Sequence, residues 1–168
     1  KRRQLSIYPE ATINRQASAA YENFRSKTKL INSGKDLNKV REIGKRIEFS
    51  VSKFFNDKDG KDPTDTFQWD YILVKNDKVI NAWCMPGGKI AVYTGLLKIT
   101  QNDNALAVVM GHEIAHAVAK HSIERASQAL TVNLGTQVAD IFLGGAINRT
   151  RSTIGQSSGM DIFQLGIF

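Results

Sequence analysis

The sequence predicts an α+β fold in which helices precede and follow a small β-sheet. Two long stretches near the N-terminus carry apolar residues at helical spacing, and three shorter runs rich in β-branched and aromatic residues come after them. A further helical stretch contains all three histidines of the chain. This order of elements, α-α-β-β-β-α, is typical of a domain whose helices pack against one sheet.

Two N-terminal helices are predicted at residues 10–28 and 35–56. Apolar side chains recur there every three or four residues, as Ile13, Ala17, Ala20, Tyr21 and Phe24 in the first helix and as Leu37, Val40, Ile43, Ile47, Val51 and Phe54 in the second. The basic segments "RSKTK" and "KVREIGKR" are interpreted as solvated faces of these helices.

The sheet is predicted from three runs that follow the turn-like segment "NDKDGKDP". The runs "TFQWDYILV" and "KVINAWCM" are expected to form a hairpin around residues 75–78, and "PGGKIAVYTG" is expected to form a third strand after a Gly-Gly turn. The segment "GLLKIT" is expected to be a short helix that leads into the histidine segment.

Length and composition suit one globular domain over residues 1–168, because 42% of the residues are hydrophobic and 23% are charged. The single cysteine, Cys84, excludes an internal disulfide framework and a zinc site made of several cysteines. The chain opens at "KRRQLSIYPE" without an apolar signal core, so we expect any targeting segment to lie outside it.

The net charge of +7 is unevenly distributed, with a balance of +8 in residues 1–61 and −1 in residues 62–168. A basic surface of this kind suits anionic phospholipid or nucleic acid. No aromatic side chains alternate with these charges and no nucleic-acid-binding motif is present, so nucleic acid is not an expected partner.

The segment "VVMGHEIAHAVAKHS", residues 108–122, contains His112, Glu113 and His116 in the pattern HExxH. Thr100 and Asp103 resemble a capping box before the apolar run "ALAVVM", which predicts that the motif lies well inside a helix. Four residues along a helix turn by about 40° and rise by about 6 Å, so the two imidazoles project side by side and can chelate one metal ion.

This pattern predicts zinc-dependent hydrolysis. Imidazole nitrogens bind zinc at about 2.0–2.1 Å, and a helix fixes two of them while leaving positions open for water. Glu113, about 100° round from His112, would take a proton from that water as general base and pass it to the leaving amine. The alternative is that His112 and His116 are ordinary histidines of a structural helix. His121 lies about 180° round from His116 and is not expected to be a ligand.

The segment "GHEIAHAVAKHS", preceded by "NAWCMPGGKIAVYTGLL", resembles the family of zinc endopeptidases that includes the CAAX prenyl protease, HtpX, BepA and the mitochondrial protease Oma. The resemblance implies a zincin-like (gluzincin) minidomain with zinc on His112 and His116 and with Glu113 as the catalytic base. It also implies that one strand lines the cleft and pairs with an extended substrate. The substrate-binding residues of that strand are Gly88, Lys89, Ile90, Ala91 and Val92.

In that family a glutamate from a later helix, within a Glu-rich motif ending in Ala-Asp, is the third protein ligand of the zinc. After His121 the only acidic residues are Glu124, Asp140 and Asp161, and none lies in such a motif. We therefore expect the third ligand beyond Phe168, in a domain shortened at its C-terminus, and expect this chain alone to bind zinc weakly. The alternative is a ligand from another chain.

Residues 129–147, "ALTVNLGTQVADIFLGGAI", are predicted to form a long amphipathic C-terminal helix, because Asn133, Gln137 and Asp140 interrupt the apolar run. The apolar face of such a helix would favour a dimer or another partner if nothing in the chain covers it. The expected partners of the chain therefore include a membrane surface and a second copy of the chain bound through this helix.

These features together predict a zinc-dependent endopeptidase of gluzincin type that acts on polypeptides, among them misfolded or envelope proteins. One alternative is a weakly active zincin scaffold that binds unfolded polypeptides in a chaperone-like way, and a basic adaptor for membranes or nucleic acid is a more distant one. From the resemblance alone we expect a role in protein quality control in the bacterial cell envelope, either periplasmic or anchored by lipid.

Overall fold

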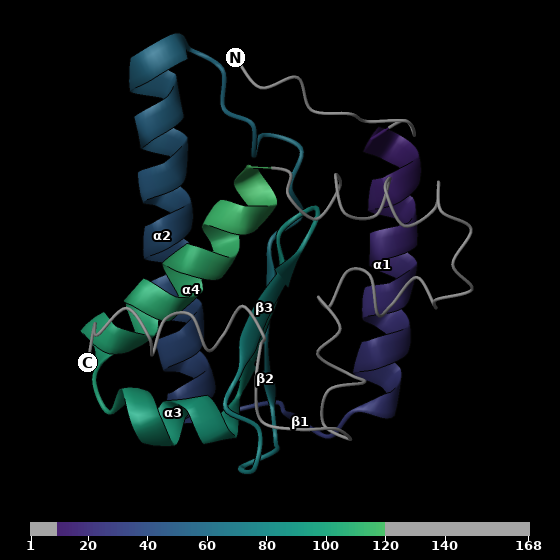
Figure 1. Ribbon diagram of the computed structural model, residues 1–168, viewed down its shortest axis with the longest axis vertical. Helices are drawn as coiled ribbons and strands as arrows, with labels where there is room; N and C mark the ends of the chain where they lie inside the picture. Colours follow the sequence, from purple (N-terminus) through teal and green to yellow (C-terminus); the bar gives the residue numbers. More distant parts are fainter. Residues whose placement is uncertain (1–9, 120–168) are drawn as a thin grey trace, which may run out of the picture.

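The computed structural model describes residues 10–119, in which helices lie on both faces of a small sheet (Figure 1). The helices are α1 (Glu10–Lys27), α2 (Lys35–Asp59), α3 (Thr94–Thr100) and α4 (Asp103–Val118), and the strands are β1 (Leu30–Ile31), β2 (Asp70–Val74), β3 (Ala82–Met85) and β4 (Lys89–Tyr93). The predicted α+β class is confirmed. The predicted C-terminal helix at residues 129–147 lies outside the described residues.

The two N-terminal helices form where the apolar spacing predicts them. In α1, Ile13, Ala17 and Tyr21 are completely buried. The second helix, α2, ends at Gly60, which has a φ of 63° and donates its N–H to the carbonyl of Asn56 at 3.2 Å. Phe54, which the spacing assigned to the buried face, is 57% exposed because it lines an open pocket of about 390 Å³ between α2 and α4.

The strand order is β1-β2-β4-β3, so the predicted hairpin between residues 66–74 and 78–85 is wrong. The two strands expected to form that hairpin, β2 and β3, are separated by β4. β4 is parallel to β2 and antiparallel to β3. The tight turns that suit hairpins need residues with positive φ, and the only described non-glycine residue with positive φ is Gln101. Residues 75–78 therefore start a longer connection that packs against α3, where Gly95 donates its N–H to the carbonyl of Asn76 at 3.2 Å.

The hairpin that does form joins β3 to β4 through Pro86, Gly87 and Gly88. Gly87 and Gly88 have φ values of 84° and 79°, and Gly88 donates its N–H to the carbonyl of Met85 at 3.3 Å. Proline followed by a residue with positive φ is the pattern of a type II turn. Gly88 also allows a close approach, because a Cβ atom there would lie 2.9 Å from the Trp69 ring.

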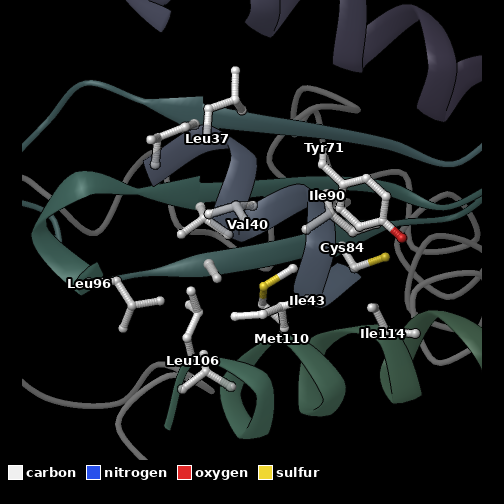
Figure 2. Close-up of a cluster of buried hydrophobic side chains, with 14 of the residues drawn as sticks. Leu37, Val40, Ile43, Tyr71, Cys84, Ile90, Leu96, Leu106, Met110 and Ile114 are labelled. Carbon is white, nitrogen blue, oxygen red and sulfur yellow. The ribbon is translucent and has the colours of Figure 1, made fainter. Parts of the chain in front are cut away.

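The sheet separates two apolar cores. On one face, buried side chains of α2, the sheet and α4 meet; Figure 2 labels Leu37, Val40, Ile43, Tyr71, Cys84, Ile90, Leu96, Leu106, Met110 and Ile114 among them. On the other face, α1 packs against Trp83, which makes edge-to-face contacts with Tyr21 and Phe24. Within residues 10–119, no helix combines the length and the apolar character needed to cross a bilayer.

Candidate active site

The HExxH motif lies in the second half of α4, as predicted. The start of this helix differs from the predicted capping box, because the N-cap is Asn102 and not Thr100. The Asn102 Oδ1 accepts a hydrogen bond from the Ala105 N–H at 2.9 Å, whereas the Thr100 hydroxyl donates to the carbonyl of Leu96 in α3. Asp103, in the first turn, forms a salt bridge with Lys39 of α2, with 3.1 Å between Oδ1 and Nζ. This salt bridge connects the two helices.

Packing of α4 against the sheet fixes the direction of the motif. The inner face of the helix consists of Leu106, Val109, Met110, Ile114 and Ala117, all of them at most 7% exposed. In Figure 2, Leu106 lies near Leu96, whereas Ile114 lies toward Tyr71 and Cys84. The motif is therefore held at the end of the sheet where β2 and β4 begin, beside the turn at residues 86–88. We call this region the histidine end.

His112 and His116 lie one turn apart and bring their Nε2 atoms to 3.0 Å from each other. Their ring centroids are 4.5 Å apart with the ring planes at 86°, and both side chains are half-buried. Two imidazoles on one tetrahedral zinc ion, each at about 2.05 Å, would have their nitrogens about 3.3 Å apart. The observed pair fits a shared zinc ion after a small rotation of the rings. The same distance also suits a hydrogen bond between a protonated and an unprotonated ring nitrogen.

Glu113 is half-buried and lies close enough to strand β3 for its charge to act on Cys84. Burial raises the pKa of the Cys84 thiol on β3, and the nearby negative charge of Glu113 raises it further. Cys84 is only 5% exposed and its Sγ lies 3.5 Å from the carbonyl oxygen of Met85. The position of Glu113 beside Cys84 was not predicted, because their proximity depends on α4 packing against β3.

The predicted substrate-binding residues occupy the turn and the strand next to the motif. Hydrogen bonds to β2 and β3 occupy both edges of β4, and Ile90, Ala91 and Val92 are completely buried. β4 therefore has no open edge for a substrate strand. The edge strand of the described sheet on this side is β3, whose four residues are also buried. A contact of residues 88–92 with substrate stays a prediction, but strand pairing would have to use β3.

Among residues 10–119, the candidate metal ligands that the structure brings together are His112 and His116. In the part of the chain that the structure describes, no group of three or more His, Cys, Asp or Glu side chains is arranged around one point. His121 and the later acidic residues Glu124, Asp140 and Asp161 lie outside the described residues.

Comparison with known proteins identifies the family. The sequence matches Peptidase family M48 over residues 45–168. The mitochondrial metalloendopeptidase OMA1 of Arabidopsis thaliana is 43% identical over 72 residues, which are 43% of this chain and 14% of that protein. Metalloprotease YcaL of Escherichia coli is 32% identical over 76 residues, 45% of this chain and 30% of that protein. The beta-barrel assembly-enhancing protease of Escherichia coli is 37% identical over 51 residues, 30% of this chain and 10% of that protein.

The matched stretches thus cover at most 30% of the length of these three relatives. The family match includes the whole HExxH segment, the β3–β4 hairpin and most of α2. Because it covers well over half of the sequence, the chain belongs to Peptidase family M48.

Proposed function

We propose that this chain carries the metal-binding part of a zinc-dependent endopeptidase, in which His112 and His116 hold the zinc ion and Glu113 is the general base. The approach of the two Nε2 atoms to 3.0 Å on one side of α4 carries the proposal. Membership of a peptidase family supports it, as do the relatives named metalloendopeptidases.

Zinc, when bound, polarises a peptide carbonyl and lowers the pKa of water. The residues of this chain orient the reactants. Burial of Ile114 and Ala117 fixes the rotation of α4, so that His112 and His116 present their ring nitrogens to one point. Glu113 follows His112 directly and is placed to accept a proton from the attacking water and to deliver it to the leaving amine. We propose an extended polypeptide as the substrate, lying along the histidine end.

The test is to measure zinc content and cleavage of casein for the wild-type chain and for His112→Ala and His116→Ala. The wild-type chain is expected to bind one zinc ion weakly and to cleave little, and each substitution is expected to abolish both zinc binding and the remaining cleavage. His121→Ala is the matched control, since His121 is not an expected zinc ligand. Equal zinc binding by all four proteins would refute the assignment. Zinc and casein binding without cleavage, also in longer forms of the protein, would favour the chaperone-like alternative.

We also propose that the protein acts in a bacterial cell envelope on misfolded or envelope proteins. The beta-barrel assembly-enhancing proteases of bacteria support this location, while the OMA1 relatives are named as mitochondrial. Cell fractionation with an antibody against this chain tests the proposal, and recovery with cytoplasmic markers would contradict it.

A further inference from the structure

The end of the molecule opposite the histidine end carries a group of exposed lysines. Three segments form this end of the molecule, residues 27–36, 75–80 and 94–99, and together we call them the basic end. The six lysines of these segments are all exposed, namely Lys27, Lys29, Lys35, Lys75, Lys78 and Lys98. The only acidic residues in the three segments are Asp36 and Asp77, so their net charge is +4.

Specific contacts bring the three segments together. Lys75 donates its backbone N–H to the carbonyl of Lys29 at 2.8 Å, next to the pairing of β1 with β2. Lys98 of α3 pairs with Asp77 at 2.7 Å, and Thr94 donates its hydroxyl to the same carboxylate at 2.6 Å. These contacts therefore bring together at one end of the molecule three segments whose lysines are up to 71 residues apart in the sequence.

The negative charge of Asp77 is already counted in the net charge of +4. Hydrogen bonds from Lys98 and Thr94 lower the pKa of its carboxyl group, and the charges of Lys98 and Lys75 lower it further. Its carboxylate is thus already engaged with lysines of the same surface. Two exposed apolar side chains flank the lysines, Ile80 at 48% and Ile99 at 37% exposed.

The loop at the histidine end has the opposite charge. Residues 57–70, which run from the last turn of α2 through the connecting loop to the first residue of β2, contain two lysines and five aspartates, a net charge of −3, and we call them the acidic loop. Figure 1 shows this connection and the last turns of α4 at the top of the molecule, with β1, α3 and the connection after β2 at the bottom. The basic end and the acidic loop therefore carry net charges of opposite sign.

We propose that the basic end is a docking surface for an anionic phospholipid bilayer, which holds the histidine end away from the bilayer. Lysines attract the anionic surface, and exposed isoleucines suit the boundary between headgroups and acyl chains. Nucleic acid fits less well. The three segments contain no arginine to bind a phosphate group with two hydrogen bonds and no aromatic residue to stack on a base. The proposal does not depend on the peptidase chemistry of the other end.

The first test is co-sedimentation of the wild-type chain with vesicles of phosphatidylcholine alone and of phosphatidylcholine mixed with phosphatidylglycerol. Binding is expected only to the mixed vesicles and is expected to fall as salt is raised. The substitutions Lys29→Gln, Lys75→Gln and Lys78→Gln, made together, are expected to weaken it at least about tenfold. These lysines form no side-chain ion pair in the described structure, so the triple variant should stay folded, which its circular dichroism would verify.

A matched triple variant, Arg41→Gln, Lys45→Gln and Lys61→Gln, removes the same charge from exposed positions outside the basic end. It is expected to change vesicle binding less than about twofold, because its side chains do not belong to the docking surface. An equal loss in both triple variants would overturn the basic end as a defined surface. The proposal would also be overturned if the wild-type chain did not bind the mixed vesicles. Salt-sensitive self-association of the wild-type chain that only the Lys29, Lys75 and Lys78 triple variant removes would overturn it as well.

The orientation is tested with a fluorophore that reports its contact with lipid. Ser33→Cys places the label at the basic end and Thr66→Cys places it in the acidic loop, and both positions are exposed. The native Cys84 is only 5% exposed, so it competes little for the label. Mixed vesicles are expected to change the emission of the fluorophore attached at residue 33, but not of the one attached at residue 66. A response at residue 66, or equal responses at both positions, would show the opposite or no preferred orientation.

Discussion

The histidine end and the basic end differ in how the chain assembles them. At the histidine end, three chemically active side chains come from five consecutive residues of α4, and the packing of that helix orients them together. At the basic end, the lysines come from three segments that meet only through the fold. The first arrangement depends on one helix and the second on contacts between loops, so different substitutions should damage each end separately.

The largest expected effect is the loss of cleavage on Glu113→Gln, which rests on the proposed function. In a form of the protein that extends beyond Phe168, removing the general base should lower kcat about 10²–10⁴-fold, while zinc content stays unchanged because the histidines are intact. Glu48→Gln is the control, since this half-buried glutamate on α2 lies outside the HExxH motif and accepts a hydrogen bond from Tyr71 at 3.3 Å. Cleavage by the Glu113 variant at the wild-type rate would remove Glu113 from the mechanism.

Two glycine substitutions should separate the two ends. At the histidine end, Gly88→Ala adds a Cβ atom 2.9 Å from the Trp69 ring, and the backbone there has a φ of 79°. At the basic end, Gly95→Ala adds a Cβ atom that collides with the carbonyl oxygen of Val79. Each should lower the free energy of unfolding by roughly 1–3 kcal/mol in urea titrations. Gly88→Ala should also weaken zinc binding but not vesicle binding, and Gly95→Ala should do the reverse.

Gly111→Ala is the matched control for both substitutions. It lies in α4, where an added Cβ atom meets nothing within 4 Å. Alanine is the better helix former, so this variant should be more stable than the wild type by about 0.5–1 kcal/mol. If Gly88→Ala and Gly95→Ala weaken both activities equally, the two ends are coupled and the comparison fails.

The sequence predicts the helices and the HExxH segment because both are properties of short-range spacing. The apolar positions of α1 and α2 repeat every three or four residues, and His112 and His116 are one helical turn apart. These features need no knowledge of which segments are neighbours. The same reasoning explains why the pair of histidine nitrogens was found at the expected place.

Strand order and the basic end could not be predicted in this way. The run before residue 75 and the run after residue 78 have the composition of hairpin strands, but the positive φ angles that close a tight turn occur at Gly87 and Gly88 instead. The basic end follows from that topology, because β4 inserts between β2 and β3 and α3 then packs beside the 75–80 connection. The uneven charge of the sequence indicated an excess of lysine but not this grouping.

Each end also has a carboxylate with a lowered pKa, and the two should differ in their effect on stability. Burial raises the pKa of Asp62, but hydrogen bonds from Ser52 and Thr64 outweigh it and hold the pKa below its ordinary value. Asp62 is only 9% exposed, with Thr64 donating its N–H at 2.7 Å, whereas Asp77 is exposed to solvent. A lowered folded-state pKa contributes stability above the unfolded-state pKa, and the contribution is lost as pH falls through the folded-state pKa.

Asp62→Asn should therefore lower the free energy of unfolding by about 1.5 kcal/mol at neutral pH, since a charge-assisted pair of hydrogen bonds is weakened. The difference from the wild type should shrink below about pH 4 and vanish once the wild-type carboxyl is protonated. Asp77→Asn, the control at the basic end, should change stability little at any pH, because solvent screens its contacts. A constant difference for Asp62→Asn from acid to neutral pH would contradict this account.

The smallest expected effect concerns the start of α4, which lies far along the helix from the histidines. Asn102→Ala removes the side chain that accepts from the Ala105 N–H at 2.9 Å and should cost about 1 kcal/mol of stability. Asn104→Ala, an exposed position that makes no cap, should cost less. Fraying of the first turn should not reach His112, about 15 Å further along the axis, so zinc affinity should stay at the wild-type value. A loss of zinc affinity with Asn102→Ala would mean that the histidine pair depends on the whole helix, and the site would then be less local than its five-residue spacing indicates.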